Sequence, residues 1–327
     1  MSLMKILSKT VFFCLSLSLC AFSLADDISK GMDLYLEGEY KEALLYFRKP
    51  QVQKNANVQN RLGVMYTKGN AVQQDHRTAF SWFMKSAQQG NPAAQFNVAY
   101  SYALGEGVAK NQVKALEWYK KAADSGVPTA MLNVGDMYRD GVGVEKNLAE
   151  ATSWYAKAAD KGNGPAQCRL GHMMLEGKGM TQNTKSAIKT LERAARYNDA
   201  CSRNLLAHMY AEGVGVRRDM VKAAKLRIEG AKKEDPQAQY DLANAYDKGL
   251  GVKKNEKDSL YWYARSASKG NLSAMQRMTE VYRHGQLGLA ADSKKASQWQ
   301  EMLTTERTAL EKGRREKIMD QATLTVR

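Results

Sequence analysis

Glycine recurs in this chain at a fixed spacing of 36 residues, and this regularity limits the possible folds more than any other feature. The seven glycines are Gly69, Gly105, Gly141, Gly177, Gly213, Gly249 and Gly285. A fixed period of this size is typical of stacked supersecondary units, each of which buries its apolar face only against its neighbours. The chain is therefore expected to fold as a repeat array and to act mainly through its surface.

Each repeat carries the pattern of two helices, which is clearest in residues 130–162. In the first helix, Ala130, Val134 and Tyr138 share one face at helical spacing, and Gly141 ends the helix because glycine readily adopts the left-handed conformation. An Asn or Asp then precedes the second helix, where its side chain can cap free backbone N–H groups. These predicted N-caps are Asp75, Asn111, Asn147, Asn183, Asp219, Asn255 and Asp292.

The second helix carries an aromatic pair, and burying each ring contributes roughly 2–3 kcal/mol by area. The pairs are Trp82-Phe83, Trp118-Tyr119, Trp154-Tyr155 and Trp262-Tyr263. Two repeats depart from the pattern, with Thr190-Leu191 and Leu226-Arg227 instead. Since large rings pack against small residues, the pattern predicts close contact between neighbouring helices. Pro92, Pro128 and Pro236 are expected at the first position of the next first helix, where a missing N–H costs nothing.

These residues resemble the Sel-one-like repeat, a relative of the tetratricopeptide repeat, whose pattern A-x3-L-G-x2-Y-x2-G-x-G-V-x2-D-x2-K-A-x2-W-Y-x-K-A-A matches residues 130–159 almost throughout. The resemblance implies an all-α, right-handed superhelical solenoid of antiparallel helix pairs, with seven repeats in residues 55–303. Residues 26–54 are expected to form a short tetratricopeptide-like N-terminal cap. The charged residues 304–327 are expected to prolong the last helix as a C-terminal cap and tail.

The first 25 residues have the pattern of a secretory signal peptide. Lys5 and Lys9 stand before an apolar run that starts at Val11. Small residues at Ser23 and Ala25 predict cleavage after Ala25. A lipoprotein signal built on Cys20 is disfavoured, because Leu19 stands where a small residue is required. No later segment has the roughly 20 apolar residues of a membrane span. The mature chain is therefore expected to be periplasmic or secreted and not membrane-spanning.

Charge indicates the kind of partner. Without Lys5 and Lys9, 47 basic residues face 34 acidic ones, a net charge of +13, which favours an acidic protein or an anionic envelope surface. Export argues against nucleic acid. One basic position recurs just before the second-helix caps, at Lys110, Lys146, Arg218 and Lys254. A cation near a helix N-terminus is mildly unfavourable, so helix stability does not explain these residues. Two explanations remain for these four basic residues: duplication of an ancestral repeat, or a basic edge that meets an acidic partner.

A binding surface is expected opposite the core face of the first helices. A step of 100° per residue places Leu132, Asp136 and Arg139 on the side opposite the core residues Val134, Met137 and Tyr138. By resemblance to tetratricopeptide arrays, this side lines a concave groove that binds a protein or peptide. The groove residues are Phe96, Tyr100, Leu132, Asp136, Arg139, His172, His208, Tyr240 and Asn244. These positions vary between repeats while the core positions hardly vary. Phe96, Tyr100 and Leu132 are expected to form an exposed apolar pocket.

The two cysteines that follow the signal peptide, Cys168 and Cys201, leave three interpretations open. They could remain thiols, form a disulfide that export favours, or contribute to a metal site made of Cys168, His172 and His208. The spacing of helix axes, roughly 8–10 Å, argues against the disulfide. The position of Cys201, about two turns from the histidines, argues against a four-ligand site.

Sequence signals for catalysis are weak. Gly105 and Gly107 lack the preceding strand and third glycine of a dinucleotide loop, and no H-E-x-x-H or G-x-S-x-G motif occurs. The chain is therefore expected to be a scaffold or adaptor without a cofactor, serving envelope signalling or host interaction. The alternatives are an envelope hydrolase or binder of cell-wall fragments, and a metal-dependent sensor.

Overall fold

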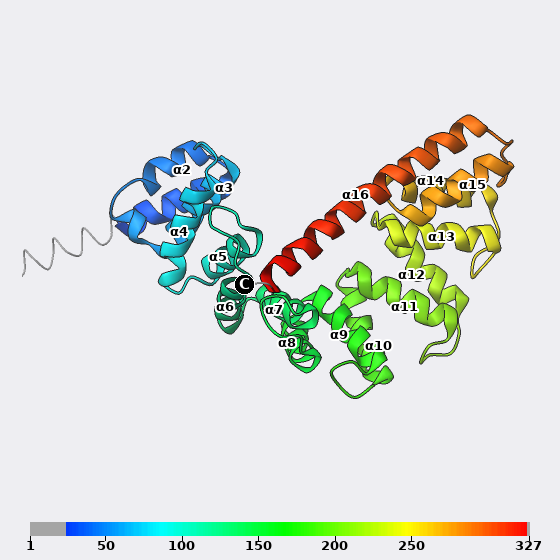
Figure 1. The fold of residues 1–327 in the computed structure, drawn as a ribbon, viewed down its shortest axis with the longest axis horizontal. Coiled ribbons are helices and arrows are strands. Elements are labelled where there is room, and N and C mark those ends of the chain that lie inside the picture. The colour runs from blue at the N-terminus through cyan, green and yellow to red at the C-terminus, as the bar shows by residue number, and fades with distance from the viewer. Residues whose placement is uncertain (1–23, 326–327) are drawn as a thin grey trace, which may run out of the picture. The chain divides into compact units, whose positions relative to one another are not determined.

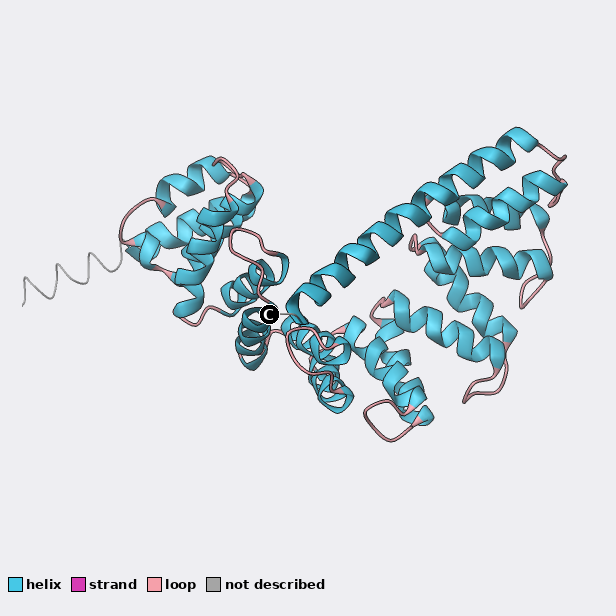
Figure 2. Cartoon of the chain, viewed as in Figure 1, coloured by secondary structure: helices cyan, strands magenta, loops and turns pink. Residues whose placement is uncertain are grey.

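The computed structural model describes the backbone of residues 24–325 and the side chains of residues 24–312. The predicted signal peptide, residues 1–25, lies almost wholly outside this range. The described backbone consists of helices joined by turns and loops, without a strand (Figure 2). The chain divides into two compact units, Met1–Asn147 and Leu148–Arg327.

In the described part of the first unit, a helix over residues 24–37 is followed by α2 (Tyr40–Phe47) and a short 3-10 helix η1 (Val52–Lys54). The helices that follow are α3 (Ala56–Lys68), α4 (His76–Gln88), α5 (Pro92–Leu104), α6 (Gln112–Asp124) and α7 (Pro128–Asp140). In the second unit they are α8 (Leu148–Asp160), α9 (Gly164–Glu176), α10 (Thr184–Arg196), α11 (Ala200–Glu212), α12 (Met220–Lys232), α13 (Pro236–Lys248), α14 (Glu256–Ser268), α15 (Leu272–His284) and α16 (Ser293–Thr325).

Within each unit, a helix packs on the one that follows it, as Figure 1 shows for α3 to α6 and for α9 to α15. In the second unit α9 also packs on α11, so first helices of neighbouring repeats are in contact. The predicted α-solenoid of helix pairs is confirmed. The last helix, α16, packs on α15, where Leu303 is buried and Trp299 covers the same apolar cluster.

The helix ends follow the predicted signals. All seven periodic glycines are left-handed, with φ between 63° and 81°. The side chain of Asp75 accepts hydrogen bonds from the N–H groups of Arg77 and Thr78, and Asn111, Asn183, Asp219, Asn255 and Asp292 cap their helices in the same way. Asn and Asp also cap most first helices, as Asn91 caps α5, which the sequence interpretation had missed.

The second glycine of the G-x-G turn is required by a close approach between repeats. A Cβ atom at Gly251 would lie 1.9 Å from the carbonyl oxygen of Met220, at the start of the preceding repeat's second helix. At Gly107 the corresponding distance to the carbonyl oxygen of His76 is 2.0 Å. No side chain fits at these distances, so this glycine fixes the spacing of successive repeats as well as giving the turn its flexibility.

Contacts between large and small residues hold each pair together. A Cβ atom at Gly63 of α3 would lie 2.4 Å from the ring of Phe83 in α4. At Gly171 of α9 it would lie 2.7 Å from Leu191 of α10. The small position of the first helix therefore receives the second residue of the aromatic pair, or the leucine that replaces it.

Candidate functional site

The predicted groove positions fall into two classes in the structure. In the row that contains Phe96 and Leu132, several side chains are buried: Asn60 is 7% exposed, Leu132 8% and Cys168 0%. In the row one turn later, Tyr100 is 46% exposed, and His172 and His208 are also exposed. A first helix has neighbours on more than one side: α9, for example, packs on α11 as well as on α8 and α10. Helical angles alone do not reveal these additional neighbours. The expectation of an exposed apolar pocket that includes Leu132 is therefore wrong.

In the first unit, an aromatic cluster lies where α5 meets α6. The rings of Phe96 and Tyr119 meet edge to face with centroids 5.4 Å apart. Burial raises the pKa of Tyr119 to about 12, and a hydrogen bond with Asn133 opposes this rise. Tyr100 lies close enough to Tyr119 to affect its titration while keeping about half of its own surface in solvent. This cluster holds Tyr100 beside a rigid aromatic base.

The predicted charged groove residues of the first unit pair with one another. Arg139 lies 3.0 Å from the carboxylate of Asp136 and 2.7 Å from that of Asp140. In this arrangement the guanidinium group is held by carboxylates on its own helix, which limits what it offers to an anionic ligand.

In the second unit, Tyr240 and Asn244 are tied to the core tyrosine of the repeat. The hydroxyl group of Tyr263 donates to Oδ1 of Asn244 at 2.8 Å, and the rings of Tyr240 and Tyr263 lie 5.8 Å apart. Burial raises the pKa of Tyr263 to about 12, with the nearby Asp247 adding to the rise and Arg277 opposing it. Asn244 and Tyr240 are therefore half-buried residues of α13 that help to hold α13 against α14.

The structure also reveals a pairing that sequence reasoning missed. In two aromatic pairs, the second residue interacts with the residue 14 positions later, on the next first helix: Tyr119 with Asn133 and Tyr263 with Arg277. In the repeat where arginine replaces tyrosine, Arg227 acts electrostatically on Asp241, which stands at the same offset. The departure at Arg227 is thus matched by an acidic partner. The spacing of 14 residues can be read from the sequence, but only the packing of the helices shows that the two residues interact.

Burial also changes the titration of Asp241, on the first helix α13. Burial raises its pKa above the ordinary value, and Asp235 acts in the same direction. A hydrogen bond from Nε2 of Gln237 at 3.1 Å, together with Arg227 and His208, opposes the rise. His208 is therefore close enough to Asp241 to act on its carboxylate electrostatically.

The basic edge has a structural role that the sequence interpretation did not foresee. Nε of Arg218 donates to the carbonyl oxygen of Ala211 at 2.9 Å, and at the same repeat position Gln74 and Gln182 donate to the carbonyl oxygens of Thr67 and Leu175. These carbonyls lie in the last turn of the preceding first helix. The expectation that helix stability does not explain this position is therefore wrong, because a donor or cation at a helix C-terminus is favourable.

The other members of the edge are less uniform. Lys254 lies 3.5 Å from the carboxylate of Glu256, an exposed ion pair that contributes little to stability. Lys110 and Lys146 are both exposed, and each lies beside the glycine that ends the preceding first helix, Gly105 or Gly141. A shared ligand-binding role for the four residues is not needed to account for their positions.

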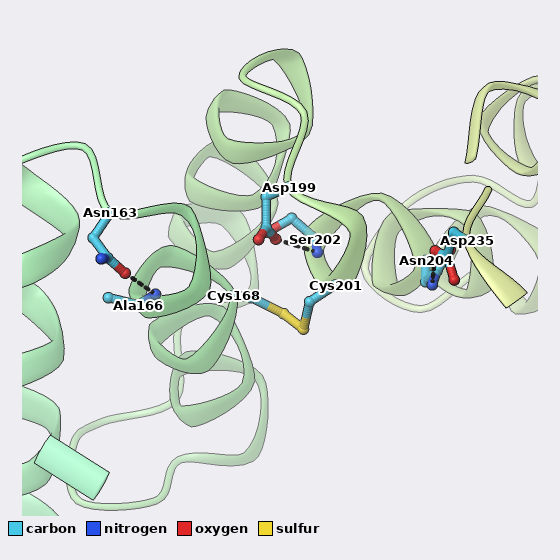
Figure 3. Close-up of a disulfide and its surroundings, with 8 residues drawn as sticks. All are labelled: Asn163, Ala166, Cys168, Asp199, Cys201, Ser202, Asn204 and Asp235. Atoms are coloured by element: carbon cyan, nitrogen blue, oxygen red, sulfur yellow. Dashed lines mark hydrogen bonds between the residues drawn. A yellow bond between two sulfur atoms is a disulfide. The ribbon is translucent and has the colours of Figure 1, made fainter. Parts of the chain in front are cut away.

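Cys168 and Cys201 form a disulfide that links α9 to α11 (Figure 3). Their Cα atoms are 6.0 Å apart. The argument from helix axes overestimated this distance, because Cα atoms on facing surfaces lie closer together than the axes do. The two helices are capped beside the bridge by Asn163 and Asp199, which accept hydrogen bonds from the N–H groups of Ala166 and Ser202.

The potential metal ligands differ from the expected set. Ligand atoms of Cys168, His172 and Cys201 all lie within 4.8 Å of one another, and His208 is not part of this group. The expected two-turn separation of Cys201 from the histidines does not hold for His172. A cysteine in a disulfide offers no thiolate to a metal, so the disulfide and metal interpretations remain mutually exclusive.

Stacked helix pairs with left-handed glycine caps define this molecule as an α-solenoid repeat protein. The model of the Sel1 repeat family matches residues 56–91, 92–127, 128–163, 164–199, 202–233 and 236–271. The chain belongs to the Sel1 repeat family, whose members commonly mediate protein–protein interactions and are typically non-enzymatic. The expected seventh repeat, where α15 and α16 pack together, lies beyond these matches and stays a prediction.

Two solved structures illustrate the similarity. A Sel1 repeat protein from Oxalobacter formigenes is 33% identical, with 85% of this chain and 96% of that one covered and a TM-score of 0.55. The protein c5321, a protective antigen present in uropathogenic Escherichia coli strains that displays an SLR fold, is 25% identical, with 92% and 82% covered and a TM-score of 0.63. A search of curated proteins found no match. Among the described residues, no helix has the length and apolar character that crossing a membrane requires.

Proposed function

We propose that this protein is an exported scaffold that binds a protein or peptide through the exposed row of its first helices. The exposed row is defined within each unit by itself: it consists of Tyr100, with the half-buried Asp136, in the first unit and of His172 and His208 in the second. The single observation that carries this proposal is the exposure of Tyr100, 46%, on a first helix whose core residues Val98, Ala99 and Tyr102 are buried. A tyrosine ring held on a rigid aromatic base suits the centre of an interface, because little conformational entropy is lost on binding.

The chemistry of the row differs between the two units, so each unit offers its own kind of contact to a ligand. Tyr100 offers an aromatic surface in the first unit, while His172 and His208 offer exposed imidazoles in the second. The net charge of +13 without the leader favours an acidic partner or an anionic envelope surface as the setting. These properties and the protein–protein interactions common in the family support adaptor work in envelope signalling or host interaction.

Export is supported by the leader pattern and by the disulfide. A disulfide between Cys168 and Cys201 persists in an oxidising compartment such as the periplasm or the extracellular space. Cleavage after Ala25 is tested by the intact mass of protein recovered from the envelope and the medium. A first residue of Asp26 is expected, and an intact leader in both fractions would contradict export.

The binding proposal is tested by affinity capture with residues 26–327 as bait at physiological salt, followed by mass spectrometry. Tyr100→Ala should lose the retained protein. Tyr197→Ala is the matched control, because Tyr197 is also an exposed tyrosine, 81% exposed, but lies outside the exposed row. Retention that survives Tyr100→Ala would reject this surface, and retention of glycan alone would favour the binding of cell-wall fragments.

A further inference from the structure

The repeat that contains α12 lacks the tryptophan of the aromatic pair. Trp82, Trp118, Trp154 and Trp262 occupy this position in four repeats, while α12 has Leu226. The lysine that covers the ring three residues later is also replaced. Nζ of Lys85 lies 4.4 Å from the ring centroid of Trp82, whereas Glu229 stands at the corresponding place in α12. The ring and its cation have therefore been lost together.

The space that such a tryptophan fills is visible in the first unit. Trp82 packs against an apolar cluster that contains Leu62 of its own first helix and Phe47 of the preceding α2. Leu226 packs against the equivalent cluster, which contains Leu206 of α11. Because leucine is much smaller than tryptophan, the same position is only partly filled in α12.

A hollow of about 430 Å³ lies where the ring is missing. Its apolar walls come from Ala195, Leu206 and Leu226, and Arg196, Lys222 and Lys225 stand among the residues around them. Three successive helices, α10, α11 and α12, thus surround a recess with an apolar base and cationic side chains near it. All three helices belong to the second unit, whereas Tyr100 and its aromatic cluster belong to the first.

A second hollow of about 650 Å³ adjoins the first, with Tyr210 and Lys222 in common, and adds Arg217 and Arg218. The two hollows together carry five basic side chains and three acidic ones, Glu192, Asp219 and Glu229. Asp219 accepts a hydrogen bond from the N–H of Lys222 as the cap of α12, and Glu192 lies 3.5 Å from the hydroxyl of Tyr210. With five basic side chains against three acidic ones, the lining of the two hollows carries a net positive charge.

We propose that this Trp-less hollow binds an acidic peptide segment of a partner protein, with one aromatic side chain inserted where the repeat's own tryptophan is missing. The aromatic ring would bury apolar surface against Leu206 and Leu226, and acidic neighbours of the ring would face Lys222, Lys225 and Arg217. This surface lies on the second-helix side of the array and is independent of the exposed row. An inserted aromatic anchor flanked by charges of opposite sign is a frequent arrangement at protein interfaces.

The test uses a synthetic probe, the fluorescently labelled peptide Glu-Asp-Trp-Asp-Glu with blocked ends, and fluorescence anisotropy with the oxidised mature protein. Saturable binding is expected. Leu226→Trp should weaken it at least tenfold, because the new ring occupies the hollow. Since tryptophan is the repeat's usual residue there, Leu226→Trp should keep or raise the thermal unfolding midpoint, which separates occlusion from misfolding.

Val221→Trp is the matched control, because Val221 is 69% exposed on the same helix and does not line the hollow. This variant should bind the peptide as the parent does. A peptide with alanine in place of tryptophan should not bind, and one with Asn and Gln in place of its acidic residues should bind more weakly. Equal binding by Leu226→Trp and the parent, or no saturable binding to the parent, would overturn the proposal, whatever the outcome of Tyr100→Ala.

Discussion

Nε of Arg218 donates a hydrogen bond to the carbonyl oxygen of Ala211 at 2.9 Å, so this basic side chain stabilises the helix that precedes it. Gln74 and Gln182 make the equivalent bond in other repeats, which shows that the position needs a donor more than a charge. The repeat position of Arg218, which resembled part of a basic binding edge, therefore stabilises the C-terminus of the preceding helix.

This role predicts the effect of substitutions at Arg218. Arg218→Gln should unfold in urea at nearly the parent midpoint, because glutamine makes the same bond elsewhere in the chain. Arg218→Ala should lose about 1 kcal/mol, the usual net value of one hydrogen bond, and Arg218→Glu should lose more. Equal stability of all three variants would contradict the assignment.

The close approach at Gly251 predicts a large cost for a single methyl group. In Gly251→Ala the new Cβ would lie 1.9 Å from the carbonyl oxygen of Met220, so the backbone must move and the free energy of unfolding should fall by more than about 2 kcal/mol. Gly162→Ala is the control in the same unit. Gly162 is also left-handed, with φ of 82°, but no atom lies within 4 Å of the added Cβ, so its cost should be about 1 kcal/mol. Similar losses in the two variants would mean that the spacing of repeats does not depend on Gly251.

Asp241 predicts a pH dependence of known sign. Its pKa is raised by burial and by Asp235, despite Gln237, Arg227 and His208, so the folded state binds more protons than the unfolded state above the ordinary value of 3.8. This contribution to stability is complete below the unfolded pKa and is lost as the pH rises through the folded one. Relative to Asp241→Asn, the parent should therefore lose stability between about pH 3 and pH 6. Urea unfolding of both proteins across this range measures the difference, and a parent that gains on the variant with rising pH would contradict the sign.

The disulfide predicts that the oxidised mature protein has no titratable thiol, even when unfolded, because Cys168 and Cys201 are its only cysteines. Reduction should lower the free energy of unfolding by about 3–4 kcal/mol, given the sequence separation of 33 residues. Cys168→Ser/Cys201→Ser, measured without a reductant, should show the same loss. Two reactive thiols in the protein as purified from the envelope would contradict the bridge.

Most of the fold follows from local chemistry and was therefore predictable. Left-handed glycines such as Gly69 and side-chain caps such as Asp75 act within a few residues of themselves, so their spacing alone indicates where helices end. The burial of Leu132 was not predictable in this way, because it depends on neighbours outside its own repeat. The same holds for the electrostatic interaction of Arg227 with Asp241 and for the role of Arg218, each of which joins positions whose proximity only the packing establishes.

The central claim, that the protein binds a partner through its exposed row, is tested most directly by a titration of the captured partner against three forms of the mature protein. The dissociation constant should rise at least tenfold for Tyr100→Ala and stay unchanged for Tyr197→Ala. Equal dissociation constants for the parent and Tyr100→Ala would contradict the claim.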